Sequence, residues 1–530
     1  MRQWRSCIMN QTHRSTPTYT NSCSDTESLL RKSASSVGLL ISFQIASHAL
    51  TFFLNTVIIR KIDHSLYGFS TVQLQLVVSA ILFISREAIR NVCQRTDVTQ
   101  QGGRDQVAWL SWMAIPIGVA IKSVVIFGTY YTSSSEELAV VGYSRSVSVI
   151  AIAAFMELLI EPVYIRLSLQ LDFRSVVVVE SVSLIVQCGC TILLLSVADI
   201  GAATFAYARV AYASTMVIGY YILWCIVRKY RFSDLLPALN TWRFILPALK
   251  KTTPFWVQST QMWLLSEGQR VVMKMVLALD DQAKYSLVSN LGSLPVRILL
   301  RPIENVCGVY FSKHVVLGVI ETRLRFQQTQ RLMILIAMIF IAFGPAYSSV
   351  LIHLLYSNYN DSDTSRLLSV FFVYVGLMGL NGVMEVFVRS VANDKSIRQH
   401  NMRLLPHTVL HLILSYFMCW CLGSLGLIVA ECVDMVVRIY SSHHFATEYF
   451  AENDDTRYSA RRMVPSAYSF MVIFVAALCC NISAYRVLDF LVYKWVAVHV
   501  VIGVVSIGCT VYAITHIERD SIRMFHIKQK

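Results

Sequence analysis

Four polar or charged side chains interrupt an otherwise apolar segment in the second half of the chain. The segment is SLVSNLGSLPVRILLRPIEN, residues 286–305, and the four are Asn290, Arg297, Arg301 and Glu304. An arginine at the centre of a membrane helix costs about 2.5–3.5 kcal/mol, so a chain keeps one there for pairing or for function. If Pro295 and Pro302 only kink the helix, all four side chains lie along one stripe.

Similar polar stripes recur in other apolar runs, at the spacing that places side chains on one helix face. They comprise Gln44, His48, Thr51 and Asn55; Glu157 and Glu161; Glu267, Arg270 and Lys274; Asn381 and Glu385; and Glu431, Asp434 and Arg438. A charged cluster also ends a run in each half of the chain, SREAIR (85–90, with Arg86, Glu87 and Arg90) and RPIEN (301–305).

Two interpretations of these stripes stay open. Carboxylates such as Glu267 or Glu304 pair with arginines and brace the helix bundle. Alternatively, stripes on helices of both halves share one polar space and line a cavity. We favour the cavity for the set as a whole, whereas His48 taken alone is more typical of a packing histidine.

Composition indicates the class of protein. Of 530 residues 55% are hydrophobic and 15% charged, and the mean hydropathy is +0.54, which is typical of an all-α polytopic membrane protein. The net charge of +14 sits in short connections between apolar runs, so it reflects membrane topology and argues against nucleic acid as a partner. The thirteen cysteines lack metal-ligand or disulfide spacing, and neither G-x-x-x-x-G-K-[ST] nor H-E-x-x-H occurs. The sequence therefore favours a transporter over an enzyme, with no metal and no cofactor.

Apolar runs of roughly twenty residues, enough to cross about 30 Å of hydrocarbon, predict about fourteen transmembrane helices. They cover 37–59, 66–85, 107–130, 139–160, 174–197, 203–227, 254–279, 284–310, 331–355, 367–390, 403–421, 423–440, 464–484 and 493–515. The odd-numbered connections hold six Lys or Arg, the even-numbered ones twenty-four and the two tails nine. This asymmetry predicts that even connections and both termini lie in the cytosol. The sequons at Asn360 and Asn481 then lie on the other side, and glycosylation of Asn360 is left open.

The polar segment 228–252 divides the runs into two sets of six. Because six is even, both sets enter the membrane in the same direction, and a parallel pseudo-repeat becomes possible. We expect two six-helix lobes around a central cavity, followed by two further helices. The expected divisions are a disordered cytosolic tail (1–33), an N-lobe (34–227), an amphipathic cytosolic linker (228–252), a C-lobe (253–440), a cytosolic loop (441–463), the last two helices (464–515) and a cytosolic tail (516–530).

Several of these polar stretches resemble the eukaryotic Rft family of oligosaccharide translocation proteins. That family belongs to the multidrug, oligosaccharidyl-lipid and polysaccharide exporter superfamily. The matching stretches follow in order through twelve of the expected helices: TFFLNTVIIR (51–60), SREAIRNVC (85–93), MELLIEP (156–162), SEGQRVVM (266–273), NLGSLPVRILLRPIEN (290–305), LNGVMEVF (380–387) and CVDMVVRI (432–439).

The resemblance implies a protein of the endoplasmic reticulum membrane that handles dolichol-pyrophosphate-linked oligosaccharide for N-glycosylation. It implies a substrate cavity, for the pyrophosphate and glycan, at which we place Arg60, Arg297, Arg438, Arg270, Glu267, His48, Asn55 and Asn381. It also implies charged positions at the cytosolic mouth, for which the candidates are Arg86, Glu87, Arg90, Glu161, Arg301 and Glu304. Arginine suits this substrate because its planar fork matches phosphate oxygens. At His48 family members can carry arginine, so that part of the cavity would be basic only when the histidine is protonated.

Three functions are compatible with this resemblance. The first is translocation of the mannose/N-acetylglucosamine glycolipid from the cytosolic to the luminal leaflet. The second is a non-transport accessory that delivers the glycolipid to luminal glycosyltransferases, with other enzymes of the pathway as partners. A drug or cation antiporter would need buried carboxylates as proton sites, and the arginines count against it. The energy source, ion coupling, conformational state and oligomeric state are left open by the sequence.

Overall fold

The structure is a computed structural model that describes residues 52–96, 103–170, 172–197, 200–237, 245–314, 319–391, 394–453, 460–490 and 493–518. Over these residues the chain forms helices and turns and no strand. Residues 52–59 are helical, and the first group of elements after them is α2 (His64–Gly68), η1 (Phe69–Leu74), α3 (Gln75–Arg95), α4 (Gly103–Tyr131), α5 (Ser135–Ala139), α6 (Tyr143–Leu158), α7 (Glu161–Leu169), α8 (Phe173–Val197), α9 (Ala203–Ile222), η2 (Leu223–Val227) and η3 (Phe232–Leu235). The second group is α10 (Ile245–Val276), α11 (Leu279–Gly292), η5 (Val296–Leu300), α12 (Arg301–His314), α13 (Val319–Leu355), η6 (Ser357–Tyr359), α14 (Ser362–Val391), α15 (Asp394–Leu422), α16 (Ser424–Asn453), η7 (Ala460–Met463), α17 (Ala467–Phe490) and α18 (Tyr493–Ile517).

The expected transmembrane runs correspond to these helices. From the second run onward, each falls on one helix or on two or three successive elements, whereas most of the first run, 37–59, lies outside the described residues. Among the described residues, nine helices are long and apolar enough to cross a membrane. Helices α10, α12 and α16 are not among the nine, and they carry several of the polar stripes. The all-helical polytopic fold is therefore confirmed, and the number fourteen stays a prediction.

The segment that contains Arg297 is not one straight helix. Helix α11 ends at Gly292, the π-helical turn η5 follows, and α12 begins at Arg301. Pro295 lacks a backbone N–H and so breaks the regular hydrogen-bond ladder at this point. Such wider turns interrupt helices at functional sites more often than elsewhere.

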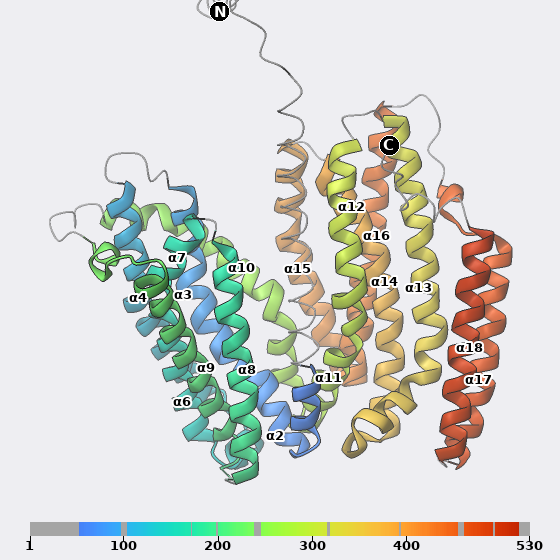
Figure 1. Cartoon of the computed structure of the whole chain (residues 1–530), viewed down its shortest axis with the longest axis horizontal. Coiled ribbons are helices and arrows are strands. Elements are labelled where there is room, and N and C mark those ends of the chain that lie inside the picture. The colour runs from blue at the N-terminus through green and yellow to red at the C-terminus, as the bar shows by residue number, and fades with distance from the viewer. Residues whose placement is uncertain are drawn as a thin grey trace, which may run out of the picture. The chain divides into compact units, whose positions relative to one another are not determined.

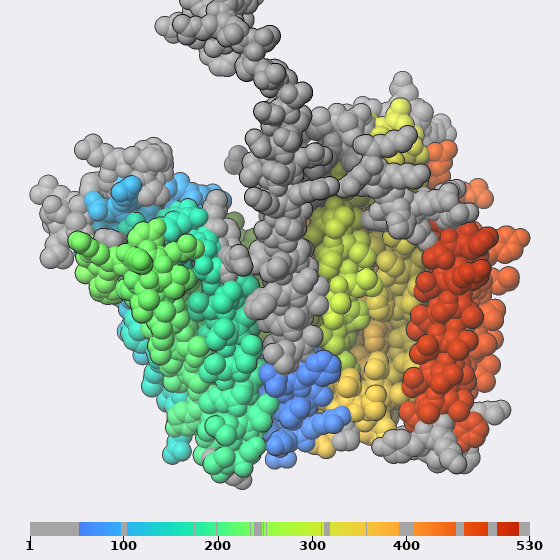
Figure 2. Space-filling view, in the orientation of Figure 1, coloured from blue at the N-terminus to red at the C-terminus, as the bar shows by residue number. Residues whose placement is uncertain are grey.

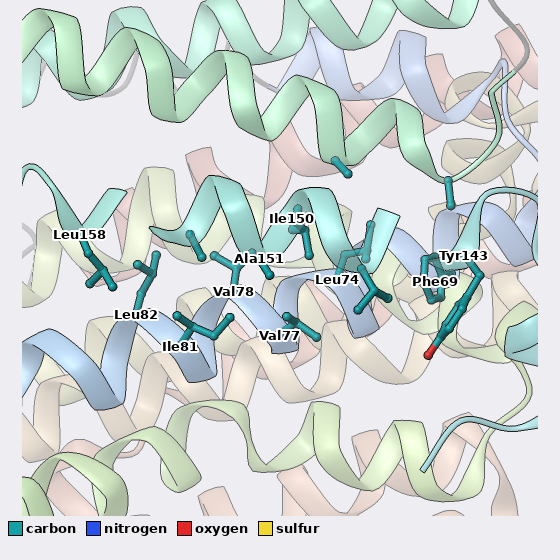
Figure 3. Packing of buried hydrophobic residues seen from close by; sticks show 14 of the residues in the cluster. Phe69, Leu74, Val77, Val78, Ile81, Leu82, Tyr143, Ile150, Ala151 and Leu158 are labelled. Atoms are coloured by element: carbon teal, nitrogen blue, oxygen red, sulfur yellow. The ribbon is translucent and has the colours of Figure 1, made fainter. Parts of the chain in front are cut away.

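An apolar cluster joins α3 to α6 along their length (Figure 3). It runs from Phe69 and Tyr143 at one end, through Val78 and Ala151, to Leu158 at the other. Small residues on α6 let the two backbones approach, which favours van der Waals packing where lipid offers no hydrophobic driving force. It is one of several apolar clusters in the first group of helices, and others join α7 to α9 and α3 to α4.

The helices form two groups with two bridging helices between them (Figure 1). In the first group α3, α4, α6, α7, α8 and α9 contact one another, and in the second α12 to α18 do so. Helix α10 packs against both α3 and α15, and α11 packs against α2, α14 and α16. Helices α17 and α18 pack together and touch the rest through α13.

Connections of the same parity come together in space. Lys61 Nζ lies 3.3 Å from Ser196 Oγ, and the Leu279 N–H donates to Glu136 Oε1 at 3.2 Å. We call this the odd-loop end, and Figure 2 shows the blue surface of α2 beside the yellow surface of the α13–α14 region there. At the even-loop end the corresponding contacts are Arg228 with Asp172, Trp112 Nε1 with Leu235 O, and Arg331 with Glu518. A chain that crosses a membrane repeatedly places odd-numbered and even-numbered connections on opposite sides, and these contacts follow that pattern.

Large apolar side chains are exposed on many helices. Phe127 on α4 is 73% exposed, Trp420 on α15 is 72% exposed and Val504 on α18 is 68% exposed. A water-soluble monomer rarely exposes so much contiguous apolar surface. Hydrocarbon is therefore the natural solvent for these helix faces.

Gly68 of α2 packs closely against the backbone of α11. A Cβ atom at this position would overlap the backbone carbonyl of Leu279 and lie 3.0 Å from the Ala283 nitrogen. Because both neighbours are backbone atoms, α2 or α11 would have to move. By contrast, a Cβ at Gly128 on α4 would meet nothing within 4 Å.

We therefore expect Gly68→Ala to destabilise the protein by about 1–3 kcal/mol, the usual cost of overpacking. Gly128→Ala is the matched control, and it should be neutral or slightly stabilising because alanine favours helix. Thermal unfolding of the purified protein in detergent measures both. Equal unfolding temperatures for Gly68→Ala and wild type would contradict the close α2–α11 contact.

Candidate functional site

Arg297 lies at the π-helical turn and folds back along its own segment. Its Nη2 donates to the Asn290 backbone oxygen at 2.8 Å, to the Asn290 side-chain oxygen at 3.0 Å and to Ser293 Oγ at 3.0 Å. Asn290 and Arg297 therefore share a face, as the stripe predicts. The Nε atom of Arg297 is buried with no hydrogen-bond partner. Among the ion pairs of the described residues, none joins a carboxylate to this guanidinium. Its hydrogen-bond acceptors are neutral oxygens, which stabilise the charge without neutralising it.

Arg438 on α16 is held by carboxylates of two helices. Its Nε lies 2.8 Å from Asp434 Oδ2 on the same helix, and its Nη1 lies 3.4 Å from Glu385 Oε1 on α14. Asn381, one turn before Glu385, donates to the same Oε1 at 3.0 Å. The structure thus brings together Arg438 and Asn381, two of the candidate cavity residues.

A histidine pair on α15 faces the same carboxylates. His407 Nε2 lies 2.8 Å from Asp434 Oδ1, and His411 lies 3.5 Å from Glu431 Oε1 and 3.7 Å from Asp434 Oδ1. The Tyr374 hydroxyl on α14 donates to Glu431 Oε2 at 2.8 Å. Together with Arg438 and Glu385, these residues form what we call the α14–α16 charge cluster.

Glu161 organises a second buried cluster, in the first group of helices. Arg90 donates to both of its carboxylate oxygens, at 2.8 and 2.6 Å, and Arg86 lies 3.6 Å away. The Glu161 side chain is only 1% exposed. The guanidinium of Arg90 also stacks 3.7 Å from the centre of the Tyr164 ring. These mouth candidates therefore lie together, in an arrangement that fastens α3 to α7.

Arg60 lies at the odd-loop end. Its Nε donates to Leu355 O at 2.7 Å and its Nη2 to Leu354 O at 2.6 Å. Both carbonyls end α13, where a cation complements the helix dipole. This contact joins the first helix to the end of α13, and it does not bring Arg60 into contact with Arg297 or Arg438.

A network of exposed and half-buried charges continues from Arg60. Lys284 Nζ lies 2.9 Å from Asp280 Oδ2 and 3.1 Å from Asp361 Oδ2, and His64 Nδ1 lies 2.7 Å from Asp280 Oδ1. The His64 ring stacks on Tyr359, with centroids 3.8 Å apart. This odd-loop network ties three separate connections to one another.

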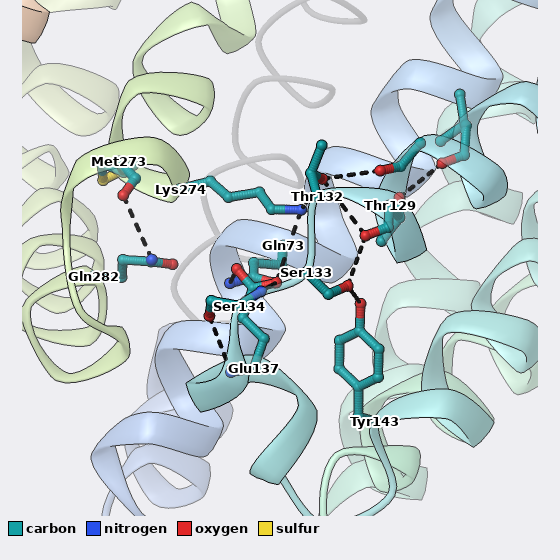
Figure 4. Close-up of polar contacts among 12 residues, drawn as sticks. Gln73, Thr129, Thr132, Ser133, Ser134, Glu137, Tyr143, Met273, Lys274 and Gln282 are labelled. Carbon is teal, nitrogen blue, oxygen red and sulfur yellow. Dashed lines mark hydrogen bonds and ion pairs between the residues drawn. The ribbon is translucent and has the colours of Figure 1, made fainter.

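Figure 4 shows a contact between the bridging helix α10 and the first group of elements. Lys274 on α10 reaches Thr132 Oγ1 at 3.2 Å and lies 3.9 Å from Glu137 Oε2. Buried Gln73 donates to Glu137 Oε1 at 2.7 Å, and Ser134 caps the same short helix α5. Lys274 is therefore a bracing residue in this structure.

The remaining candidates are placed as follows. Glu267 and Arg270 pair with each other along α10. Glu304 is half-buried against Gly382 of α14, and Arg301 is exposed. Glu87 and Asn55 are half-buried, and His48 lies outside the described residues. In the described part of the chain, no group of three His, Cys, Asp or Glu residues is arranged to hold a metal ion.

Comparison with known proteins identifies the family. The family described as Rft protein matches residues 32–528 of this chain. The chain belongs to the Rft family. Relatives named "Man(5)GlcNAc(2)-PP-dolichol translocation protein RFT1" include one from Dictyostelium discoideum, 29% identical and covering 88% of this chain and 91% of its own length. One of the same name from Xenopus tropicalis is 30% identical and covers 77% of this chain and 81% of its own length. The sequence-based resemblance is confirmed.

The Rft-family chain also shares its fold with solved transporters. Lipid II flippase MurJ, in an inward closed conformation, superposes with a TM-score of 0.64 at 14% identity over 92% of this chain and all of that one. An inward-facing multidrug resistance MATE family transporter of the MOP superfamily has a TM-score of 0.53 at 12% identity and covers 77% of this chain and 96% of that one. The protein is therefore a multi-pass membrane protein with a transporter fold.

Sequence reasoning missed two features of this Rft-family protein. His407 and His411 stand four residues apart and so share a face, but a histidine in an apolar helix has no visible partner in sequence. The Lys284 network joins three connections far apart in the chain. Neither pairing has a local signal, because each depends on how helices distant in sequence pack.

Lys284 stabilises the odd-loop network in a pH-dependent way. Burial opposes ionisation of Asp280 and Asp361, but hydrogen bonds outweigh it. Those from Lys284 and His64 hold the pKa of Asp280 below its usual range, and those from Thr364 and Lys284 do the same for the pKa of Asp361. A carboxylate with a lowered pKa contributes stability that is complete above its ordinary pKa, near 3.9, and is lost as pH falls through the lowered value.

We expect Lys284→Gln to lower the unfolding temperature near neutral pH and to flatten its fall below about pH 4. Arg325→Gln is the control, because Arg325 pairs with Glu321 on an exposed helix surface, where such pairs contribute little. Thermal unfolding over a pH series measures both variants. A wild-type acid profile in Lys284→Gln would show that the network does not depend on this lysine.

Proposed function

We propose that this protein translocates dolichol-pyrophosphate-linked Man5GlcNAc2 from the cytosolic to the luminal leaflet of the endoplasmic reticulum for N-glycosylation. The observation that carries the proposal is family membership over nearly the whole chain, with relatives that bear the name of that translocation. The fold shared with MurJ supports the proposal, because MurJ is named as a flippase of another lipid, lipid II. We propose no enzymatic activity and no cofactor.

The chemistry of the substrate fits the arginines of the second group of helices. A pyrophosphate carries negative charge into a low-dielectric region, where it needs charged donors. Arg297 is held only by neutral oxygens, so its guanidinium retains its full charge for an incoming anion. Arg438 contacts two carboxylates, and it must release at least one of them before it can bind the pyrophosphate. We therefore assign Arg297 as the primary pyrophosphate ligand and Arg438, with Asn381, as an exchanging one.

The remaining candidates have supporting roles under this proposal. Arg86, Glu87, Arg90, Glu161, Arg301 and Glu304 belong to the even-loop side of their helices, which the excess of Lys and Arg assigns to the cytosol. The glycan and pyrophosphate would enter there, while the dolichol tail stays in lipid. Arg270, Glu267 and Asn55 would line the path of the glycan, and Arg60 would help to close the luminal side.

Reconstitution tests the function directly. Purified protein in liposomes should accelerate the transfer of radiolabelled glycolipid between leaflets above the rate in protein-free liposomes. A rate equal to that of protein-free liposomes would overturn translocation. In that case, binding of the same glycolipid to the purified protein would identify the accessory role.

Arg297→Ala tests the assigned ligand. The loss of a charge-assisted contact of about 1.5–3 kcal/mol predicts at least about a tenfold lower translocation rate. Arg145→Ala is a suitable control, since Arg145 is an exposed arginine on α6 in the first group of helices. Protein yield and unfolding temperature should be unchanged in both. Wild-type translocation by Arg297→Ala would remove Arg297 from the site.

A further inference from the structure

The α14–α16 charge cluster is not electrically balanced by its permanent charges. Its carboxylates are Glu385, Glu431 and Asp434, and its permanent cation is Arg438 alone. With both histidines neutral the cluster carries two excess negative charges, and with both protonated it is neutral. Isolated negative charge within the span of a membrane is strongly disfavoured. The two histidines lie 2.8–3.7 Å from Asp434 and Glu431, so a proton bound to either imidazole offsets part of this negative charge.

The geometry places the histidines where protons would be shared. The Asp434 residue is 5% exposed, and its Oδ1 has no aligned hydrogen bond, although His407 Nε2 lies 2.8 Å away. His411 Nδ1 likewise has no aligned hydrogen bond and lies 3.7 Å from the same oxygen. A protonated imidazole donates from both nitrogens, and so it could satisfy Asp434 and Glu431 at once. Asp434 Oδ1 and His411 Nδ1 can each take part in a further hydrogen bond, which a bound proton would supply.

Charged groups on the neighbouring helices adjoin this cluster. On α12, Glu304 lies within electrostatic reach of Glu385, and its own charge is opposed by Arg301 and by Arg389 of α14. On α14, Tyr374 donates to Glu431, and Glu385 accepts from Asn381 and contacts Arg438. On α11, Tyr285 lies within electrostatic reach of Glu431 and of Arg270 on α10. Arg270 is already paired with Glu267, so it adds no uncompensated positive charge.

We propose that His407 and His411, with Asp434 and Glu431, form a proton-binding site that is linked through Asp434 to anion binding at Arg438. The proton comes from water and bonds to an imidazole nitrogen, which creates a second cation facing Asp434. That cation competes with Arg438 for the carboxylate. The guanidinium of Arg438 then becomes available to a phosphate oxygen. The anionic ligand rests on the proposed function, whereas the proton site does not.

The linkage is reciprocal by thermodynamic necessity. If protonation favours the anion, then binding of the anion must take up protons. As pH rises through the range in which the histidines titrate, the affinity for the anion should fall about tenfold per pH unit for each proton taken up on binding. A site in which Arg438 acts as a fixed charge would show no such slope.

Calorimetry of the full chain in nanodiscs tests this proposal. The probe is a synthetic prenyl-pyrophosphoryl-chitobiose, a pyrophosphate diester whose phosphates stay fully ionised throughout the neutral range. Titrations at one pH, in buffers of different ionisation enthalpy, give the number of protons taken up by the protein. We expect net uptake in wild type, and loss of uptake in the His407→Gln/His411→Gln double variant. His444→Gln, an exposed histidine on α16, is the matched control and should retain uptake.

The outcomes separate the proton site from the proposed substrate. Binding without proton uptake in wild type, or unchanged uptake in the double variant, would overturn the linkage while leaving the substrate in place. If the probe does not bind, the anion link fails together with the substrate assignment. The proton site is then tested alone, by the pH dependence of the unfolding temperature without ligand. A double variant with the wild-type pH dependence would overturn it, whereas a flattened dependence beside a wild-type profile in His444→Gln would support it.

Discussion

The cost of placing charge in hydrocarbon is the constraint on which this structure depends. The buried carboxylates Glu157, Glu161 and Asp434 each contact an arginine, and most of their contacts join different helices. Such pairs hold the helices in place, because separating the partners would leave both charges uncompensated. They hold α3 to α7, α6 to α9, and α14 to α16 through Arg90–Glu161, Arg209–Glu157 and Arg438–Glu385.

The same constraint separates two kinds of arginine. Arg90 receives two carboxylate oxygens and a tyrosine face, so its charge is fully used within the protein. Arg297 is surrounded by amide, carbonyl and hydroxyl oxygens, which orient the guanidinium without neutralising it. Arg90 and Arg297 therefore differ in the charge of their partners, and under the proposed function this difference separates a bracing arginine from a binding one.

Much of this architecture could be predicted from sequence because it is encoded locally. Apolar length predicts helices, and the distribution of Lys and Arg predicts which connections lie together, as contacts at the odd-loop end illustrate. Pairing partners are not encoded locally. The bracing interpretation holds for Glu161, which fastens α3 to α7, whereas the cavity interpretation stays a prediction. The π-helical turn that aims Arg297 was also not predicted, because a proline kink and a π-helical turn have the same sequence signal.

Under the proposed function, the strengths of these contacts indicate where the protein can rearrange. Ion pairs of the odd-loop network include Asp280, whose side chain is 46% exposed, and water can replace such contacts at little cost. The intramembrane pairs have no water to replace them, so each group of helices is expected to move as a unit. The tight contact at Gly68 joins α2 to the bridging helix α11 through backbone atoms that cannot yield. A substrate anion that draws Arg438 away from Glu385 and Asp434 would weaken such an intramembrane pair inside the second group. Ligand binding itself would thus supply the differential contact that a conformational change requires.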